Sequence, residues 1–151
     1  MNNDYRVLVQ TKRGDVADCK YYGSIYLSDS GKIIRSFGTD ENTLFYMRSL
    51  AKPLQSSIMF DCNIVDELKL LPNEIAIMTG SHGGSPYHIK VLKNLVKRFN
   101  IKTSQLLLAP SSPLDLRGFS GRKTKLHNNC SGKHIMMNLM SRYLGFSEKD
   151  Y

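Results

Sequence analysis

Segments that favour β-strands occur only in the N-terminal part of the chain, and this distribution constrains the fold more than any other feature. Residues 5–12, 21–28 and 32–37 are rich in β-branched and aromatic side chains, which favour strands. The turn residues Asp29-Ser30-Gly31 separate the last two runs, so we predict a β-hairpin with a preceding strand. Helical patterns follow throughout the rest of the chain and leave the sheet unfinished. We therefore predict an α/β fold of the α+β type.

Proline positions indicate where the first helices begin. Proline is tolerated in the first turn of a helix and not in its interior, so Pro53 indicates that Ser49 lies at or near a helix start. Residues 64–70 form a short amphipathic segment, and residues 73–79 form another, which Pro72 opens. Each segment predicts a small helix.

The strongest helical signal lies further along the chain. Ser85-Pro86 combines an N-cap with a proline at the first helical position, and apolar residues then recur at helical spacing: Leu92, Leu95, Val96 and Phe99. A last helix is predicted around residues 136–143, with Gly145 as its C-cap. No internal repeat or boundary divides the sequence, so we expect residues 1–151 to belong to a single domain.

Composition excludes several classes of protein. The chain of 151 residues has 41% hydrophobic and 23% charged residues, which is typical of a globular protein and not of a disordered one. No apolar run approaches the roughly 20 residues that span a bilayer. Charges interrupt the short N-terminal apolar stretch before a signal-peptide core forms. We therefore expect a cytoplasmic protein with no membrane association.

The cysteines predict the redox state of the chain, and the charge indicates which binding partners to expect. Cys19, Cys62 and Cys130 are an odd number without a C-x-x-C pair, so we expect reduced thiols. The formal charge is 21 − 13 = +8, which permits anionic partners. Because the basic residues are spread along the chain, nucleic acid is not an expected partner.

A serine and a lysine at one predicted helix start have the chemistry for nucleophilic catalysis. Ser49 and Lys52 are three residues apart, so their side chains lie one turn apart on one helix face. A serine hydroxyl needs a base to take its proton, and a lysine can serve as that base. S-x-x-K is also common on solvated helix faces, so the pair needs corroboration from other motifs.

Residues 80–88 form a polar loop of small residues between two predicted helices. Glycines let the backbone approach a ligand closely, and the loop presents Ser81 and His82 side by side. A tight connection between helices, with Ser85 as a helix cap, is the structural alternative. The capping role is expected in either case.

The densest polar cluster spans residues 127–134. His127, Cys130 and His134 are three and four residues apart, so they could bind Zn²⁺ from one helix face if the helix begins early enough. A helix that begins at Ser131 would break that face. The functional alternative to an enzyme is a non-catalytic module, either stabilised by zinc at this cluster or basic and nucleic-acid-binding.

Three motifs, in their order and spacing, resemble the type II L-asparaginase family of the Rhizobium etli inducible kind. They are Arg48-Ser49-Leu50-Ala51-Lys52-Pro53 with Gln55, Ser81-His82-Gly83-Gly84 with Pro86 and His88, and Asn128-Asn129-Cys130-Ser131-Gly132-Lys133-His134. The resemblance runs from about residue 22 to residue 151. It implies an amidohydrolase that converts L-asparagine to L-aspartate and ammonia, on a fold similar to that of serine β-lactamases and glutaminases.

The resemblance implies roles for individual residues. Ser49 and Lys52 would form one Ser–Lys pair with Lys52 as base. Ser81 would be a second active-site serine and a candidate nucleophile, and which serine attacks is left open. The neighbouring residues expected to orient the substrate are Arg48, His82, Asn129 and His134.

A zinc site is also implied by the resemblance. The family's cysteine and lysine ligands correspond to Cys130 and Lys133. A lysine ligand must first lose its proton, so such a site is pH sensitive. Where the family has Glu after Ser-His-x-Gly, this chain has Ser85, and the lost carboxylate is expected to change substrate affinity or specificity.

The chain is expected to correspond to the N-terminal half of the family's length. The family's second zinc-ligating cysteine, and the lysine expected to partner Ser81, would lie in the other half. We therefore expect a truncated or split asparaginase with little activity alone. Open strand edges and apolar helix faces at Met136, Met140 and Tyr143 would invite a complementing half or another copy of the chain.

Overall fold

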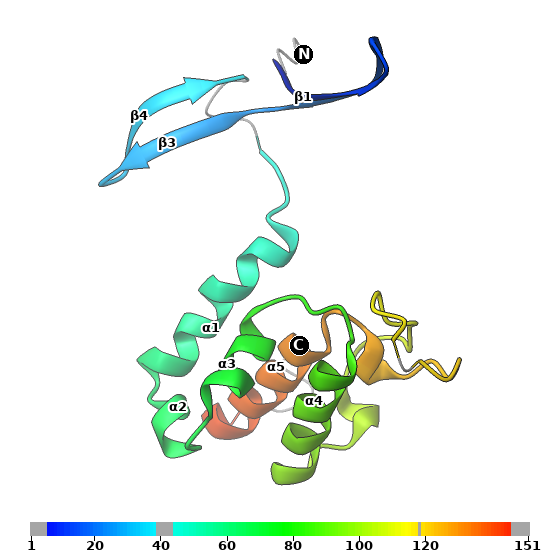
Figure 1. Cartoon of the computed structure of the whole chain (residues 1–151). Helices are drawn as coiled ribbons and strands as arrows, with labels where there is room; N and C mark the ends of the chain where they lie inside the picture. The colour runs from blue at the N-terminus through cyan, green and yellow to red at the C-terminus, as the bar shows by residue number, and fades with distance from the viewer. Residues whose placement is uncertain (1–5, 39–43, 118, 146–151) are drawn as a thin grey trace. The chain divides into compact units, whose positions relative to one another are not determined.

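The computed structural model describes residues 6–38, 44–117 and 119–145 (Figure 1). The chain divides into two compact units, one that ends at Tyr46 and one that begins at Met47. Each unit is described by itself. That both units belong to one domain stays a prediction.

The first unit contains two antiparallel hairpins, each a separate two-stranded sheet. Its strands are β1 (Arg6–Arg13), β2 (Val16–Gly23), β3 (Ile25–Asp29) and β4 (Lys32–Phe37), with β1 paired to β2 and β3 to β4. The predicted hairpin turn is confirmed, because Ser30 and Gly31 between β3 and β4 have φ angles of 48° and 78°.

The predicted strand at residues 21–28 is wrong as a single element. Its first part ends β2 at Gly23, and its second part begins β3 at Ile25. Residues 16–20 mix aspartate, lysine and alanine and so carry little strand signal, but pairing with β1 makes them the start of β2. Tyr5, where the predicted first strand begins, lies outside the described residues.

The hairpins of the first unit expose most of their apolar side chains. Val9 is 56% exposed and Tyr22 is 60% exposed. Because each described sheet has only two strands, every described strand is an edge strand. A two-stranded hairpin is only marginally stable in water without a covering layer. The prediction of open strand edges is confirmed for the part of the chain that the structure describes.

The second unit is built from helices packed around one core. The α-helices are α1 (Ala51–Asp61), α2 (Ile64–Glu67), α3 (Pro72–Thr79), α4 (Pro86–Arg98) and α5 (Ser131–Leu144). The 3₁₀ turns are η1 (Arg48–Leu50), η2 (Thr103–Gln105) and η3 (Lys125–His127). The predicted helices are therefore present, although the segment at 64–70 is α-helical only as far as Glu67. Helices together with small antiparallel strand pairs confirm the α+β class, while the β-lactamase-like fold stays a prediction.

Two predicted helix caps are confirmed. The Ser85 hydroxyl accepts a hydrogen bond from the backbone N–H of His88 at 3.3 Å and so caps α4. Gly145 ends α5 in the left-handed conformation, with φ at 77°. Of the helices in the described ranges, none has both the length and the apolar character needed to cross a membrane.

The core of the second unit depends on a close approach between α3 and α5. A Cβ atom at Gly132 of α5 would overlap the carbonyl oxygen of Ile77 in α3, so only glycine permits this packing. Met78 and Met136 are fully buried in the same core. The predicted exposure of Met136 is wrong for that reason, whereas Tyr143 at the end of α5 is 41% exposed.

Candidate active site

Lys52 brings three separate segments of the second unit together. Its side chain leaves the first turn of α1 and is only 2% exposed. The side-chain nitrogen Nζ lies 2.9 Å from Ser81 Oγ, 3.2 Å from the carbonyl oxygen of Gly80 and 3.4 Å from that of Asn129. The end of α3 and the segment before α5 therefore meet at one amine.

The chemical types of these three partners limit what Lys52 can do. The carbonyl oxygens of Gly80 and Asn129 can only accept, so two hydrogens of Nζ must point at them. The remaining position on Nζ, which holds a hydrogen in the ammonium and a lone pair in the neutral amine, faces the Ser81 hydroxyl. A hydroxyl can either accept or donate a hydrogen bond. As an ammonium, Lys52 donates to Ser81. As a neutral amine, it directs its lone pair at the Ser81 proton, which is the geometry of a general base.

Ser81 and Lys52 differ in their access to solvent. Ser81 is exposed directly after α3, whereas Lys52 lies beneath it in the protein interior. A buried charge is costly unless its hydrogen bonds are satisfied, and Lys52 has a partner for each of its donors. A substrate could therefore reach the hydroxyl from solvent while the amine remains shielded from water.

Ser49 lies apart from this arrangement. It is exposed on the 3₁₀ turn η1, and its hydroxyl makes no hydrogen bond to any residue that the structure describes. Arg48, on the same turn, is exposed and has a left-handed backbone with φ at 49°. Lys52 thus contacts Ser81 and not Ser49, because its side chain turns into the core while η1 stays at the surface.

His82 is buried and fully hydrogen-bonded. The Ser131 hydroxyl donates to the carbonyl oxygen of Leu126 at 3.2 Å, so its oxygen accepts a hydrogen bond from His82 Nε2–H at 2.9 Å. The other ring nitrogen, Nδ1, accepts from the backbone N–H of Gly84 at 3.2 Å. These partners fix the neutral tautomer with hydrogen on Nε2. The ring has no free polar atom for a substrate and instead fastens the loop after α3 to the start of α5.

The charge state of His82 agrees with this network. Burial, followed by the nearby charges of His88 and Lys52, lowers the pKa of the imidazole to about 4. The backbone N–H of His82 donates to the carbonyl oxygen of Asn129 at 3.3 Å. Asn129 therefore contributes its backbone to both His82 and Lys52.

His134 lies apart from the contact between Lys52 and Ser81. It lines a cavity of about 350 Å³ together with Met137 and Asn138 of α5 and residues of η2. Neither Lys52 nor Ser81 lines that cavity. Burial, followed by the charges of Lys133, Lys52 and Lys125, lowers the pKa of His134. Its predicted role in orienting the substrate stays a prediction.

The cysteine motif supplies too few ligands for zinc by itself. Cys130 is half-buried just before α5, and Lys133 is half-buried in the first turn of that helix. Because α5 begins at Ser131 and His127 belongs to η3, the helix face proposed for His127, Cys130 and His134 does not form. In the described ranges, no cluster of three or more His, Cys, Asp or Glu side chains is arranged to hold a metal ion.

A closed structural zinc site needs four ligands, and a catalytic site needs three from the protein. Cys130 and Lys133 could supply two, so the described residues alone do not fit a zinc ion. Zinc binding with further ligands stays a prediction.

Sequence reasoning assigned no role to several groups that build this site. Ser131 is fully buried and orients His82, and the carbonyl oxygens of Gly80 and Asn129 orient Lys52. A serine beside a glycine in a dense polar cluster was a signal for Ser131. Backbone carbonyl groups leave no signal of this kind, because every residue has one.

The family model described as L-asparaginase II matches residues 9–151. A search among curated proteins returned no match.

Proposed function

The chain belongs to the L-asparaginase II family, and on this premise we propose that Ser81 attacks the side-chain amide of L-asparagine with Lys52 as its general base. Family membership supports an amidohydrolase of the asparaginase type. The 2.9 Å contact between Lys52 Nζ and Ser81 Oγ is the observation that carries the choice of residues.

The reaction begins with Lys52 as a neutral amine. Ser81 Oγ bonds to the amide carbon of the substrate, and its proton moves to the lone pair of Lys52 Nζ. The tetrahedral adduct then breaks its carbon–nitrogen bond, and Lys52 returns the proton to the leaving nitrogen, which departs as ammonia. An ester between Ser81 and the aspartyl side chain remains.

Hydrolysis of that ester completes the cycle. Water bonds to the ester carbon while Lys52 takes its proton, and the bond to Ser81 Oγ breaks with return of the proton to the hydroxyl. L-Aspartate leaves and Ser81 is restored. The carbonyl oxygens of Gly80 and Asn129 hold Nζ in place through both steps, because they engage two of its hydrogens.

The assignment is tested by covalent labelling, which requires only one attack per molecule. The 151-residue chain is treated with a fluorophosphonate, a reagent for activated serines, and its intact mass is followed with time. We expect one adduct that Ser81→Ala abolishes and Ser49→Ala leaves unchanged. Ser49→Ala is the matched control, because both serines are exposed. Labelling that survives Ser81→Ala and disappears with Ser49→Ala contradicts the assignment.

Ammonia release from L-asparagine measures the complete reaction. Loss of an essential nucleophile lowers turnover by about a thousandfold or more. We expect that loss in Ser81→Ala and a change of less than about threefold in Ser49→Ala. Arg48 and Asn129 stay predicted substrate contacts, to be examined in the same assay.

We further propose that efficient turnover needs ligands or surface from a second chain segment or a second copy. Two findings support this: Cys130 and Lys133 offer only part of a zinc site, and the described sheets consist entirely of edge strands. Co-expression with the complementary half of a family member is expected to raise ammonia release well above that of the chain alone. Equal rates with and without that half would refute the requirement.

A further inference from the structure

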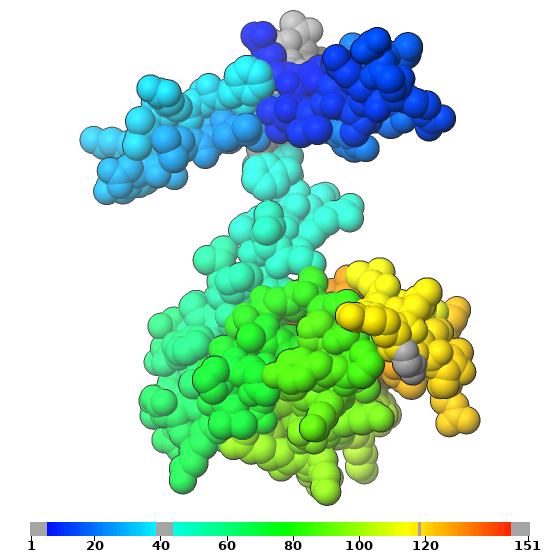
Figure 2. All heavy atoms as spheres, in the orientation of Figure 1, coloured from blue at the N-terminus to red at the C-terminus, as the bar shows by residue number. Residues whose placement is uncertain are grey.

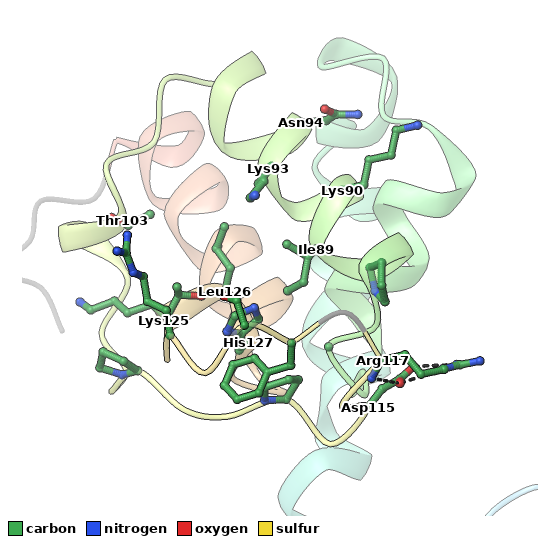
Figure 3. Close-up of a pocket in the computed structure, with 18 of the residues that line it drawn as sticks. Ile89, Lys90, Lys93, Asn94, Thr103, Asp115, Arg117, Lys125, Leu126 and His127 are labelled. Atoms are coloured by element: carbon green, nitrogen blue, oxygen red, sulfur yellow. Dashed lines mark hydrogen bonds and ion pairs between the residues drawn. The ribbon is translucent and has the colours of Figure 1, made fainter.

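A large cavity of about 1100 Å³ lies between α4 and the segment from Pro110 to His127 (Figure 3). In the space-filling view, the yellow part of this segment lies beside the green surface of the second unit (Figure 2). The volume is slightly above the roughly 300–1,000 Å³ of typical small-molecule sites. Lys52 and Ser81 do not line it, so it is separate from the candidate active site.

The charged residues of this cavity are nearly all basic. They are Lys90, Lys93, Arg117, Arg122 and Lys125, with Asp115 as the single acidic residue among the described lining residues. Asp115 is already engaged, since its carboxylate accepts from Arg117 at 2.7 Å and 2.9 Å. Hydrogen bonding to Arg117 lowers the pKa of Asp115 to about 2, so the carboxylate that faces Arg117 is ionised at neutral pH.

Two of the five cations are therefore satisfied by the protein itself. Arg117 pairs with Asp115, and Lys125 Nζ donates to the carbonyl oxygen of Leu106 at 2.6 Å. The remaining cations are Lys90, Lys93 and Arg122, which are exposed and have no ion-pair partner in the described part of the chain. Among the described residues, no carboxylate neutralises these three cations, so the lining carries an excess of positive charge.

The inner wall of the cavity is apolar and partly aromatic. Ile89 of α4, Leu126 and Phe119 contribute to it, and the Phe119 ring packs edge-on against His127 with 5.4 Å between the ring centroids. Nδ1 of His127 is buried and has no hydrogen-bond partner among the described residues. A buried polar atom without a partner is costly, so a polar group of a ligand that meets the imidazole would be favoured.

We propose that this cavity binds an organic polyphosphate with an aromatic body, such as a nucleoside triphosphate. Lys90, Lys93 and Arg122 take the phosphate groups, because several unpaired cations suit a ligand with several negative charges. The aromatic body occupies the apolar wall beside Phe119, where stacking and burial of apolar surface favour it. Inorganic phosphate alone would leave that wall and most of the volume unused.

Calorimetric titration of the 151-residue chain with ATP tests this assignment at fixed ionic strength and without L-asparagine. The variant Lys90→Gln/Lys93→Gln removes two lining cations. The variant Lys97→Gln/Lys102→Gln is the matched control, because it removes two exposed lysines from α4 and its C-terminal side that do not line the cavity. Circular dichroism of each variant checks that the helices are retained.

We expect the dissociation constant of ATP to rise about tenfold or more in the first double variant, and less than about threefold in the control. Phe119→Ala is expected to weaken ATP but to leave inorganic triphosphate unaffected. Absence of saturable ATP binding, or equal losses in the two double variants, overturns the assignment. Equal affinity for ATP and inorganic triphosphate also overturns it, because the apolar wall would then contribute nothing. None of these readouts depends on Ser81 chemistry.

Discussion

Replacement of Ser131 by alanine removes one hydroxyl that satisfies two buried groups. Ser131 is 0% exposed, and its Oγ accepts from His82 Nε2 at 2.9 Å and donates to the carbonyl oxygen of Leu126 at 3.2 Å. A buried donor or acceptor that loses its partner costs about 1–3 kcal/mol. With both groups orphaned, we expect the free energy of unfolding to fall by about 2–4 kcal/mol. Total stabilities of small domains are about 5–15 kcal/mol, so this is a large loss.

Urea unfolding followed by circular dichroism measures this loss. With an m-value of about 2 kcal/mol per molar urea, in the middle of the range for small proteins, a loss of about 2–4 kcal/mol lowers the urea midpoint by roughly 1–2 M. Ser57→Ala is the control, because the Ser57 hydroxyl is exposed and donates to the Leu54 carbonyl oxygen within α1 at 2.8 Å. Alanine favours a helix, so its effect is expected to stay within about 0.5 kcal/mol.

The comparison of the two variants tests whether the buried hydrogen bonds of Ser131 stabilise the fold, or whether the loss of any serine hydroxyl has the same effect. A midpoint for Ser131→Ala that equals that of Ser57→Ala would refute the bond between His82 and Ser131. Loss of stability with unchanged fluorophosphonate labelling would show that the network supports the fold without orienting Ser81. We expect labelling to slow as well, because His82 adjoins Ser81 in the chain.

Three further predictions use the same protein. Gly132→Ala is expected to cost about 3 kcal/mol or more in thermal unfolding, because the new methyl group overlaps the Ile77 carbonyl oxygen; an unchanged melting temperature would contradict the close approach of α3 and α5. Because the pKa of His82 falls from 6.5 in the unfolded chain to about 4 in the folded one, the unfolded chain binds the proton more tightly. The contribution of neutral His82 to the free energy of unfolding is therefore fully present above about pH 6.5. As the pH falls toward 4, the free energy of unfolding decreases by at most about 1.4 kcal/mol per pH unit. Urea midpoints that do not change between pH 6.5 and pH 4 would exclude this linkage. When the chain is co-expressed with the complementary half of a family member, cobalt(II) titration is expected to give a thiolate absorption band that Cys130→Ser removes and Cys62→Ser retains; a band that survives Cys130→Ser would assign the metal elsewhere.

Local signals in the sequence predicted the helices better than the strands. Pro72 and Pro86 fix the first turns of α3 and α4, since proline restricts the backbone wherever the rest of the chain lies. The start of β2 depends on its partner strand, and so its own residues carry little signal. Strand preference reflects cross-strand packing more than an intrinsic backbone preference.

The sequence indicated which side chains have the chemistry for a site, but not which of them meet. Ser49, Lys52 and Ser81 were all identified as chemically capable, and spacing along the helix favoured Ser49 as the partner of Lys52. The structure brings Lys52 to Ser81, which lies 29 residues away in sequence. Helix periodicity describes neighbours on one helix face, and it contains no information about which side chains meet across the core.

The long sequence separations around Lys52 have a consequence for folding kinetics. Its Nζ joins groups that lie 28, 29 and 77 residues away along the chain. Contacts of this range close large loops and so form slowly compared with the turns of a helix. The helices can appear in microseconds while the amine still lacks its acceptors. In a refolding experiment, serine reactivity should therefore appear after the helical circular dichroism signal has recovered. The time at which a serine-directed reagent begins to label the chain would then report when the contacts of Lys52 form.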